Sequence, residues 1–198
     1  MFEPIQVLPR IRLAPGYGLT ADDGSFVSSE TARGAVTLYS FAPTDCGDEC
    51  AELFATLATV QERMATEVDL GDTDFRIVTI ALDGAGDPGL LAGAARASGA
   101  DGVNWRWYGA DEDTTRTVVG AGFRRWYERA DDGSIDFDRA MVLVDGNGLI
   151  RGEYRYQTLA DDDEKFVRHA GILADEIRNA DGATALAYEA AHLFLCYP

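Results

Sequence analysis

Continuous apolar runs alternate along the chain with segments in which apolar residues recur every three or four positions. Residues 36–41 and 75–82 are runs of β-branched, aromatic and aliphatic side chains, as in strands that are buried on both faces of a parallel sheet. From Asp48 onward, apolar side chains recur at helical spacing, at Cys50, Leu53, Phe54, Leu57, Val60 and Met64. The pattern predicts a strand, a helix and a second parallel strand.

The same alternation continues as far as residue 127. Helices are predicted over residues 89–97 and 114–127, with a short strand over 103–107 between them. Gly120 and Gly122 weaken the second helix, because glycine disfavours a helix interior. A turn at residues 23–25, flanked by short strand candidates, predicts a small hairpin near the N-terminus.

A second hairpin and a terminal helix are predicted after residue 140. Residues 141–144 are apolar on both faces, and Asn147-Gly148 is a strong signal for a hairpin turn. The strand that follows divides between an apolar face and a solvated face, namely Ile150, Tyr154 and Tyr156 on the first and Arg151, Glu153 and Arg155 on the second. A helix from about residue 162 to 178 and a short alanine-rich tail helix complete the predicted elements.

Strand–helix alternation that ends in an antiparallel hairpin predicts an α/β protein of the thioredoxin-like fold. We expect a central mixed sheet flanked by helices, with a small N-terminal hairpin and an extra C-terminal helix. The predicted division is an N-terminal extension over residues 1–14, the thioredoxin-like domain over 15–180 and a helical tail over 181–198.

The charge of the chain narrows the set of partners. Its 17 basic and 34 acidic side chains give a net charge of −17, which repels phosphate backbones and argues against nucleic acid as a partner. Residues 1–19 have no uninterrupted apolar core, and the apolar stretch at 183–196 is too short to cross a bilayer. We therefore expect no signal peptide, anchor or membrane span in this chain, which as read stays in the cytoplasm. Three cysteines, an odd number, also argue against a secreted disulfide scaffold.

The candidate chemistry lies where the first buried strand meets its helix, at Cys46 and Cys50. Four residues of helix separate Cα atoms by about 6 Å and place both side chains on one face, so a reversible disulfide is feasible. A helix N-terminus stabilises a thiolate, whereas Asp45, Asp48 and Glu49 oppose it, and the sequence leaves the net effect open. Two thiolates also suit a soft ion such as Cu(I).

The surroundings of this cysteine pair resemble the Sco (SenC) family. The resemblance rests on residues 19–53, with the small hairpin, Gly34, the apolar strand, Thr44 and the CxxxC spacing, and on the later segments 79–88 and 141–148. Members of that family are thioredoxin-fold copper chaperones and thiol reductases that serve the dinuclear copper site of cytochrome c oxidase. The resemblance covers about residues 15–178 and implies copper as the metal, with Cys46 and Cys50 as ligands.

The sequence departs from the family pattern in three places. Ala51 stands where members usually have a proline after the second cysteine. Phe137 falls at the position of the family's metal-binding histidine, and no histidine is near it in the sequence. Most members have an N-terminal anchor that holds them in the membrane, outside the cytoplasm, and residues 1–19 of this chain are not expected to form one. The departure at Phe137 argues against tight copper binding.

Two further residues are candidates for a metal site. His192 and Cys196 are four residues apart in the predicted tail helix, face the same way and are the best substitutes for the missing histidine if a metal binds. The alternative is an amphipathic tail that packs on the core. Asp83 and Asp87 are interpreted as turn formers and helix caps. The three tryptophans are interpreted as core and cleft aromatics: Trp105, Trp107 and Trp126.

The sequence as a whole predicts a Sco-like thiol–disulfide oxidoreductase. Its Cys46 and Cys50 cycle between dithiol and disulfide, and Cys46 is the expected attacker because the residue before the helix is the more exposed. The expected client is a protein with copper-site cysteines, such as cytochrome c oxidase subunit II. Three alternatives remain open: a copper metallochaperone that uses the same cysteines, a peroxiredoxin-like peroxidase with Thr44 before its reactive cysteine, and a redox-inactive binding domain.

Overall fold

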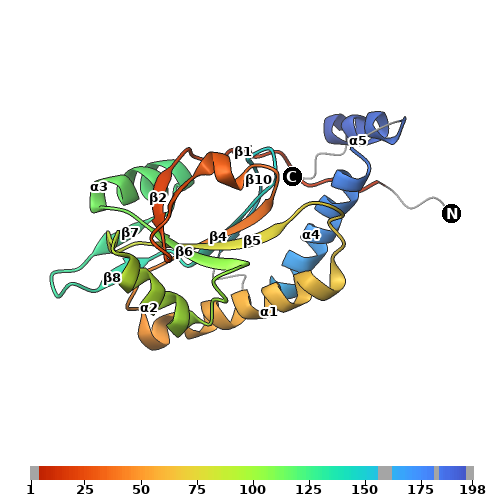
Figure 1. Cartoon of the computed structure of the whole chain (residues 1–198). Helices are drawn as coiled ribbons and strands as arrows, with labels where there is room; N and C mark the ends of the chain where they lie inside the picture. The colour runs from red at the N-terminus through yellow and green to blue at the C-terminus, as the bar shows by residue number, and fades with distance from the viewer. Residues whose placement is uncertain (1–4, 156–161, 181–182, 195–198) are drawn as a thin grey trace.

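The computed structural model describes residues 5–155, 162–180 and 183–194, and a mixed sheet of eight strands forms its centre (Figure 1). The strands are β1 (Arg12–Leu13), β2 (Gly18–Ala21), β3 (Phe26–Ser28), β4 (Val36–Ala42), β5 (Phe75–Ala81), β6 (Trp105–Gly109), β9 (Ala140–Val144) and β10 (Leu149–Arg155). They lie in the order β1-β10-β9-β4-β5-β6-β2-β3. A separate hairpin consists of β7 (Tyr127–Arg129) and β8 (Ile135–Phe137).

The centre of the sheet is parallel, as the two apolar runs predict. β4 pairs with β5, and β5 with β6, in parallel register, while β9 pairs with the other edge of β4 in antiparallel register. All seven residues of β4 are buried. Ser40 is satisfied there by a 2.7 Å hydrogen bond to Thr79, whose hydroxyl also accepts from the Trp105 indole N–H at 2.9 Å. The buried polar groups of Ser40, Thr79 and Trp105 are therefore paired with one another.

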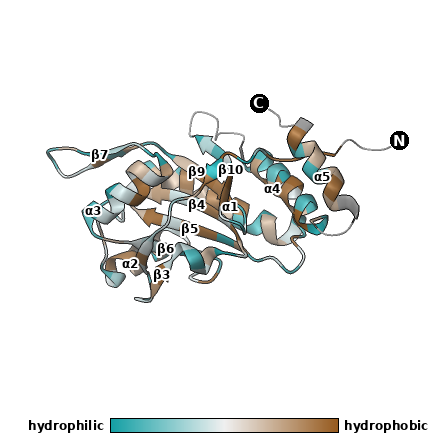
Figure 2. Cartoon of the chain, turned by 90° about the horizontal axis from the view of Figure 1, so that it is seen from above, coloured by the Kyte–Doolittle hydropathy of each residue, from teal (hydrophilic) through white to brown (hydrophobic). Residues whose placement is uncertain are grey.

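Helices cover both faces of this sheet. The helices α1 (Ala51–Glu67), α2 (Pro88–Ser98) and α4 (Asp162–Arg178) pack on the face that carries Leu38 and Ile77. The opposite face, which carries Tyr39 and Phe41, is covered by the short helix α3 (Glu112–Thr115), the π-helix η3 (Arg116–Phe123) and the β7–β8 hairpin. Figure 2 shows hydrophobic residues along β4 and β5, between these two layers. The predicted fold class, a mixed sheet flanked by helices, is confirmed.

The helix predicted over residues 114–127 is too long. It ends at Phe123, and Tyr127 instead begins a strand that pairs with Phe137. The cause lies in the backbone, since Arg124 has φ 59° and ψ 43°, a left-handed conformation that ends the helix. Gly120 and Gly122 lie in the last turns of η3, where the sequence already weakened the prediction.

The face assignment in β10 is also wrong. Ile150 packs in the cluster on one side of the sheet and Tyr154 in the cluster on the other side. The register shifts between Ile150 and Gly152, and this bulge inserts one residue and reverses the alternation. Arg151, predicted to face solvent, is buried. Tyr156 lies outside the described residues.

Both terminal segments contact the domain. β1, from the predicted N-terminal extension, pairs with β10 at the edge of the sheet. The predicted tail helix is α5 (Ala183–Phe194), where Arg10 forms a 2.6 Å ion pair with Glu189. The division of the chain at residues 14 and 180 stays a prediction. Among the described residues, no helix combines the length and apolar character needed to span a membrane.

Candidate functional site

The cysteine pair lies in the turn that joins β4 to α1. After β4 ends at Ala42, the chain passes Pro43 and forms a short 3₁₀ helix, η2 (Gly47–Cys50), that leads directly into α1. Cys46 and Cys50 form a disulfide, with their Cα atoms 5.7 Å apart. That separation lies within the range that a disulfide bridges. The strand-to-helix turn thus brings the two cysteines together as their spacing predicts.

The two cysteines differ in exposure. Cys50 is completely buried, whereas Cys46 is half-buried at the N-terminal end of η2. Attack on another disulfide requires an accessible sulfur, and the protected sulfur is placed to attack second. Cys46 is therefore the more accessible of the two sulfurs.

An apolar cluster surrounds Cys50, the buried half of the disulfide. Its buried members come from the ends of three strands, from the loop after β5, from α2 and from the cysteine turn itself: Ala42, Ala81, Trp107, Ala85, Leu91, Ala94, Ala95 and Cys50. Phe54, one turn into α1, packs against this cluster with its ring 6.0 Å from that of Trp107. The Trp107 indole N–H donates to Ser98 at 2.9 Å, so this buried donor has a partner. The surroundings of Cys50 are therefore largely apolar.

Phe137 belongs to the surroundings of this pair. The residue lies in β8, is half-buried and packs against the cluster that contains Cys50. Its position is the one at which the family resemblance expects a histidine, and a phenyl ring offers no metal ligand. In residues 5–155, 162–180 and 183–194, no three His, Cys, Asp or Glu side chains are grouped so that they could hold a metal ion.

Two hydrogen bonds between Thr44 and Asp83, called here the Thr44–Asp83 latch, hold the turn before Cys46. The Thr44 amide donates to Asp83 Oδ2 at 3.1 Å, and the Thr44 hydroxyl donates to the same oxygen. Arg129, in β7, donates from Nη2 to the Asp83 carbonyl oxygen at 3.0 Å. Asp83 thus joins the cysteine turn to the β7–β8 hairpin. The sequence indicated a turn-forming role for Asp83, but its partner Thr44 is 39 residues away and no local signal identified it.

The rim of the site is acidic. Asp45, Asp48 and Glu49 surround the cysteines in sequence, and all three are exposed. None of them has an ion-pair partner within the described part of the chain. Their negative charge opposes thiolate formation and disfavours anionic reagents near the pair.

The remaining candidates lie elsewhere. His192 is on α5, at the opposite end of the molecule from α2 and the β7–β8 hairpin (Figures 1 and 2), and its Nε2 lies 3.1 Å from Glu176. Its placement gives no support to a third ligand for Cys46 and Cys50, and Cys196 lies outside the described residues. Asp87 caps α2 by accepting from the Leu90 amide at 3.0 Å, as predicted.

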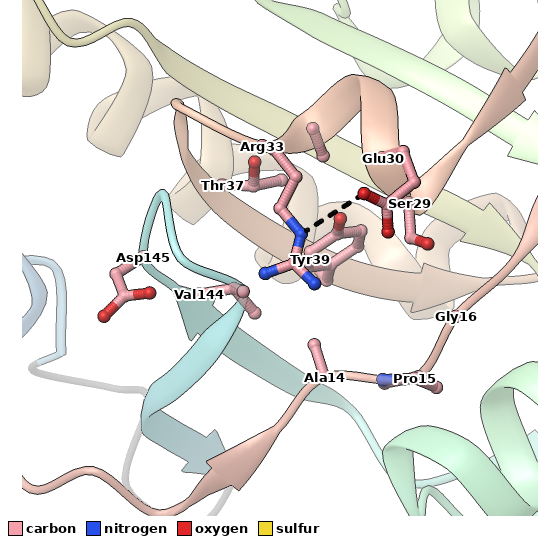
Figure 3. Close-up of a pocket in the computed structure, with 12 residues that line it drawn as sticks. Ala14, Pro15, Gly16, Ser29, Glu30, Arg33, Thr37, Tyr39, Val144 and Asp145 are labelled. Atoms are coloured by element: carbon pink, nitrogen blue, oxygen red, sulfur yellow. Dashed lines mark ion pairs between the residues drawn. The ribbon is translucent and has the colours of Figure 1, made fainter.

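A small cavity of about 70 Å³ lies at the other end of β4 (Figure 3). Arg33 and Glu30 form a 3.9 Å ion pair at this cavity, and the Tyr39 hydroxyl hydrogen-bonds to Tyr17 at 2.9 Å. Burial raises the pKa of both phenols, that of Tyr17 to about 12. Because Thr37 and Tyr39 near the start of β4 line it, this cavity is separate from the cysteine turn.

Comparison with known proteins identifies relatives of this arrangement. The chain is similar to Arabidopsis thaliana ScoI with copper bound (17% identity, TM-score 0.68, covering 80% of this chain and 98% of that one). It is also similar to a SCO1/SenC family lipoprotein from Bacillus anthracis (20% identity, TM-score 0.71, covering 81% of this chain and 94% of that one). A third neighbour is BsSco, described as having a disulfide switch (18% identity, TM-score 0.72, covering 86% of this chain and 98% of that one). These likenesses confirm the thioredoxin-like fold.

The sequence comparisons give the family. A search of curated proteins finds no match. The family model for SCO1/SenC, however, matches residues 7–170, which include the cysteine turn, the Asp83 loop and the β7–β8 hairpin. The chain therefore belongs to the SCO1/SenC family.

Proposed function

We propose that this chain is a thiol–disulfide oxidoreductase that acts through Cys46 and Cys50 on the cysteines of a copper-site client protein. The observation that carries the proposal is the disulfide itself, which joins a half-buried sulfur to a fully buried one at the start of a helix. BsSco, a structural neighbour, is described as a member of a family of cytochrome c oxidase assembly proteins with a disulfide switch. That description supports an oxidase subunit such as subunit II as the client.

The reaction begins from the dithiol form. The Cys46 thiolate attacks one sulfur of the client disulfide, and the other client sulfur leaves as a thiolate that takes up a proton. Cys50, deprotonated in turn, then attacks the Cys46 sulfur of the mixed disulfide and releases the second client thiolate. The client gains two electrons, the Cys46–Cys50 disulfide forms, and a dithiol reductant returns the pair to its starting state.

Copper transfer is the second candidate function, with copper as the cargo. The neighbours from Arabidopsis thaliana and yeast have copper bound. In the dithiol form, Cys46 and Cys50 supply two soft donors, a set that suits Cu(I). Cu(II) prefers additional nitrogen or oxygen ligands, and Phe137 supplies none. The donor set therefore favours Cu(I) over Cu(II) for any cargo of this chain.

Differential alkylation tests the redox proposal. In a Cys196→Ser background, which removes the third thiol, oxidised protein should protect Cys46 and Cys50 from alkylation, and reduced protein should expose Cys46 first. The Cys50→Ser variant should accumulate a mixed disulfide with a model disulfide peptide, because the resolving thiol is lost. The Cys46→Ser variant is the matched control and should form little of this adduct.

Two results would contradict the redox proposal. Full alkylation of both cysteines after oxidant treatment means that no functional disulfide forms. A reduction potential well below that of the glutathione pool marks the bond as structural rather than catalytic.

A further inference from the structure

A second, open cavity of about 450 Å³ lies where η3 ends and β7 begins. Its lining is cationic and aromatic: Arg116, Gly120, Arg124, Arg125, Trp126 and Tyr127. Two of these three arginines have carboxylate partners, Arg116 with Glu112 at 2.9 Å and Arg125 with Glu153 at 2.8 Å. Arg124 has no ion-pair partner among the described residues and supplies the free positive charge of the cavity, on a molecule with a net charge of −17.

The backbone around the cavity is irregular. η3 is a π-helix, and π-helical turns occur frequently at functional sites. Arg124 follows it with φ 59°, a conformation that costs a non-glycine residue free energy and persists only when the surrounding structure holds it. A glycine would avoid that cost, yet the chain places an arginine there.

Arg125 anchors the floor of the cavity. Its side chain is 3% exposed, and its Nη2 lies 2.8 Å from Glu153 while its Nε donates to the Phe123 carbonyl at 3.0 Å. Nη1 is buried without a hydrogen-bond partner among the described residues, and the Asp138 carboxylate is 3.9 Å away. A buried guanidinium with an unused donor favours a ligand that brings an acceptor oxygen.

The exposed part of the cavity combines charge with an aromatic surface. Trp126, interpreted from sequence as a core or cleft residue, is 57% exposed. Arg116, held by its ion pair with Glu112, lies 5.8 Å from the centre of the Tyr127 ring, while Arg124 has no ion-pair partner within the described ranges. Arginine, tryptophan and tyrosine are the residue types that carry most of the binding energy at protein interfaces. Together they fit a polypeptide with carboxylates and apolar side chains.

The cavity is connected to the cysteine site through the β7–β8 hairpin. The Trp126 carbonyl accepts from the Asp138 amide at 3.0 Å, and Tyr127 pairs with Phe137, which packs against the Cys50 cluster. Two residues after Tyr127, Arg129 donates to the Asp83 carbonyl, and the Asp83 side chain holds the cysteine turn. A polypeptide seated in the cavity is thus held on the same hairpin that contacts the redox site.

We propose that this cavity binds an acidic segment of the client polypeptide and so presents the client's cysteines to Cys46. The identity of the occupant as a client rests on the proposed redox function, whereas the binding itself does not. The acidic rim around Cys46 repels such a segment, and Arg124 together with the unused Arg125 Nη1 donor supplies the attraction that offsets this repulsion.

Peptide binding tests the proposal by fluorescence anisotropy. The probe is a fluorescein-labelled twelve-residue peptide of Asp, Glu, Gly and two Phe, and its control has Asn and Gln in place of the acidic residues. The acidic peptide should bind at least tenfold more tightly than the amide peptide. Arg124→Gln should weaken its binding about tenfold, the effect of one charge-assisted hydrogen bond, and Trp126→Ala should weaken it several-fold.

The matched control is Arg168→Gln, an exposed arginine on α4 whose loss changes the net charge equally. It should alter binding by less than twofold. Equal losses in Arg124→Gln and Arg168→Gln would reduce the effect to overall charge and overturn the proposal. Equal binding of both peptides would overturn it as well, and so would full competition by inorganic phosphate at constant ionic strength, which indicates a site for a free anion. Binding measured in the Cys46→Ser/Cys50→Ser variant separates this proposal from the redox proposal.

Discussion

The two ends of the molecule differ in whether their charged side chains are exposed or buried. At the cysteine end, the buried groups are apolar and aromatic, and the acidic residues around Cys46 and Cys50 are left on the surface. At the end formed by β10, α4 and α5, charged side chains are buried together. Arg151 lies 3.0 Å from Asp145 and 2.6 Å from Glu176, and all three side chains are less than 10% exposed.

The buried network also joins segments that are distant in sequence. Glu176 accepts from the Leu8 amide at 2.7 Å and lies 3.1 Å from His192 Nε2, so it connects the N-terminal segment, α4 and α5. Arg151 adds hydrogen bonds to the carbonyls of Leu8 and Pro9. Every partner in such a network must stay in place, because a buried charge without its counterion is costly.

The buried ion pairs and the cysteine pair lie at different ends of the molecule, so substitutions can test stability and thiol chemistry separately. The ionic end joins the segment around Leu8 to α4 and α5, and it contains no cysteine among the described residues. The cysteine end has no buried charge in its apolar cluster, so opening or closing the disulfide breaks no ion pair there. We expect substitutions at the ionic end to change stability, and substitutions at the cysteine end to change reactivity.

The largest effect is expected for Arg151→Ala. This change leaves Asp145 and Glu176 buried without their counterion and should lower the free energy of unfolding by about 3–5 kcal/mol. Arg76→Ala, which removes an exposed ion pair to Asp74, is the control and should cost less than about 1 kcal/mol. Urea denaturation measures both. Similar losses in the two variants, or slower thiol exchange per folded molecule in Arg151→Ala, would remove the contrast.

Phe137→His tests the chemistry of the cysteine end. An imidazole beside the Cys50 cluster adds a ligand that Cu(II) accepts, so Cu(II) affinity should rise at least tenfold, by about 1.4 kcal/mol. Phe26→His, on exposed β3, is the control and should leave the affinity unchanged. Anaerobic titration of reduced protein measures both. Tight Cu(II) binding by wild type that is lost in His192→Ala would instead make α5 a ligand-bearing arm.

Added salt should change the contribution of the exposed charges to stability and leave that of the buried charges nearly the same. Screening relieves the repulsion of a chain with a net charge of −17 but leaves the buried Arg151 network nearly unaffected. The melting temperature should therefore rise by about 2–4 °C, or about 1 kcal/mol, between low and molar sodium chloride. A melting temperature that stays constant or falls over this range would show that charge repulsion does not limit the stability of the fold.

The smallest effect concerns the acidic rim. Asp48→Asn/Glu49→Gln removes two exposed negative charges that oppose the Cys46 thiolate, and alkylation of reduced protein by neutral iodoacetamide should accelerate about two- to threefold at pH 7. Glu62→Gln/Asp72→Asn changes the net charge equally at exposed positions outside the cysteine turn and should leave the rate unchanged. Equal acceleration in both variants would assign the effect to overall charge.

Local signals in the sequence were sufficient for most elements and for the cysteine pair. The apolar runs at β4 and β5 predict buried parallel strands because such strands have no polar face. Cys46 and Cys50 are four residues apart in a strand-to-helix turn, so their proximity follows from local geometry alone. The family resemblance, and no local signal, put Phe137 at the place of the metal-binding histidine, and the structure packs it against the Cys50 cluster.

Only the tertiary structure decided which distant groups meet. The bulge after Ile150 reverses the faces of β10, and it buries Arg151 where the alternating pattern predicted solvent. The latch between Thr44 and Asp83 joins two loops that follow neighbouring strands, and the cavity beside Trp126 requires the left-handed turn at Arg124. Periodicity reports the average environment along one element, whereas a bulge, a latch or a cavity depends on where a second element lies. For that reason the sequence by itself determined the cysteine pair and the fold class, and the tertiary structure determined which distant residues pack around that pair.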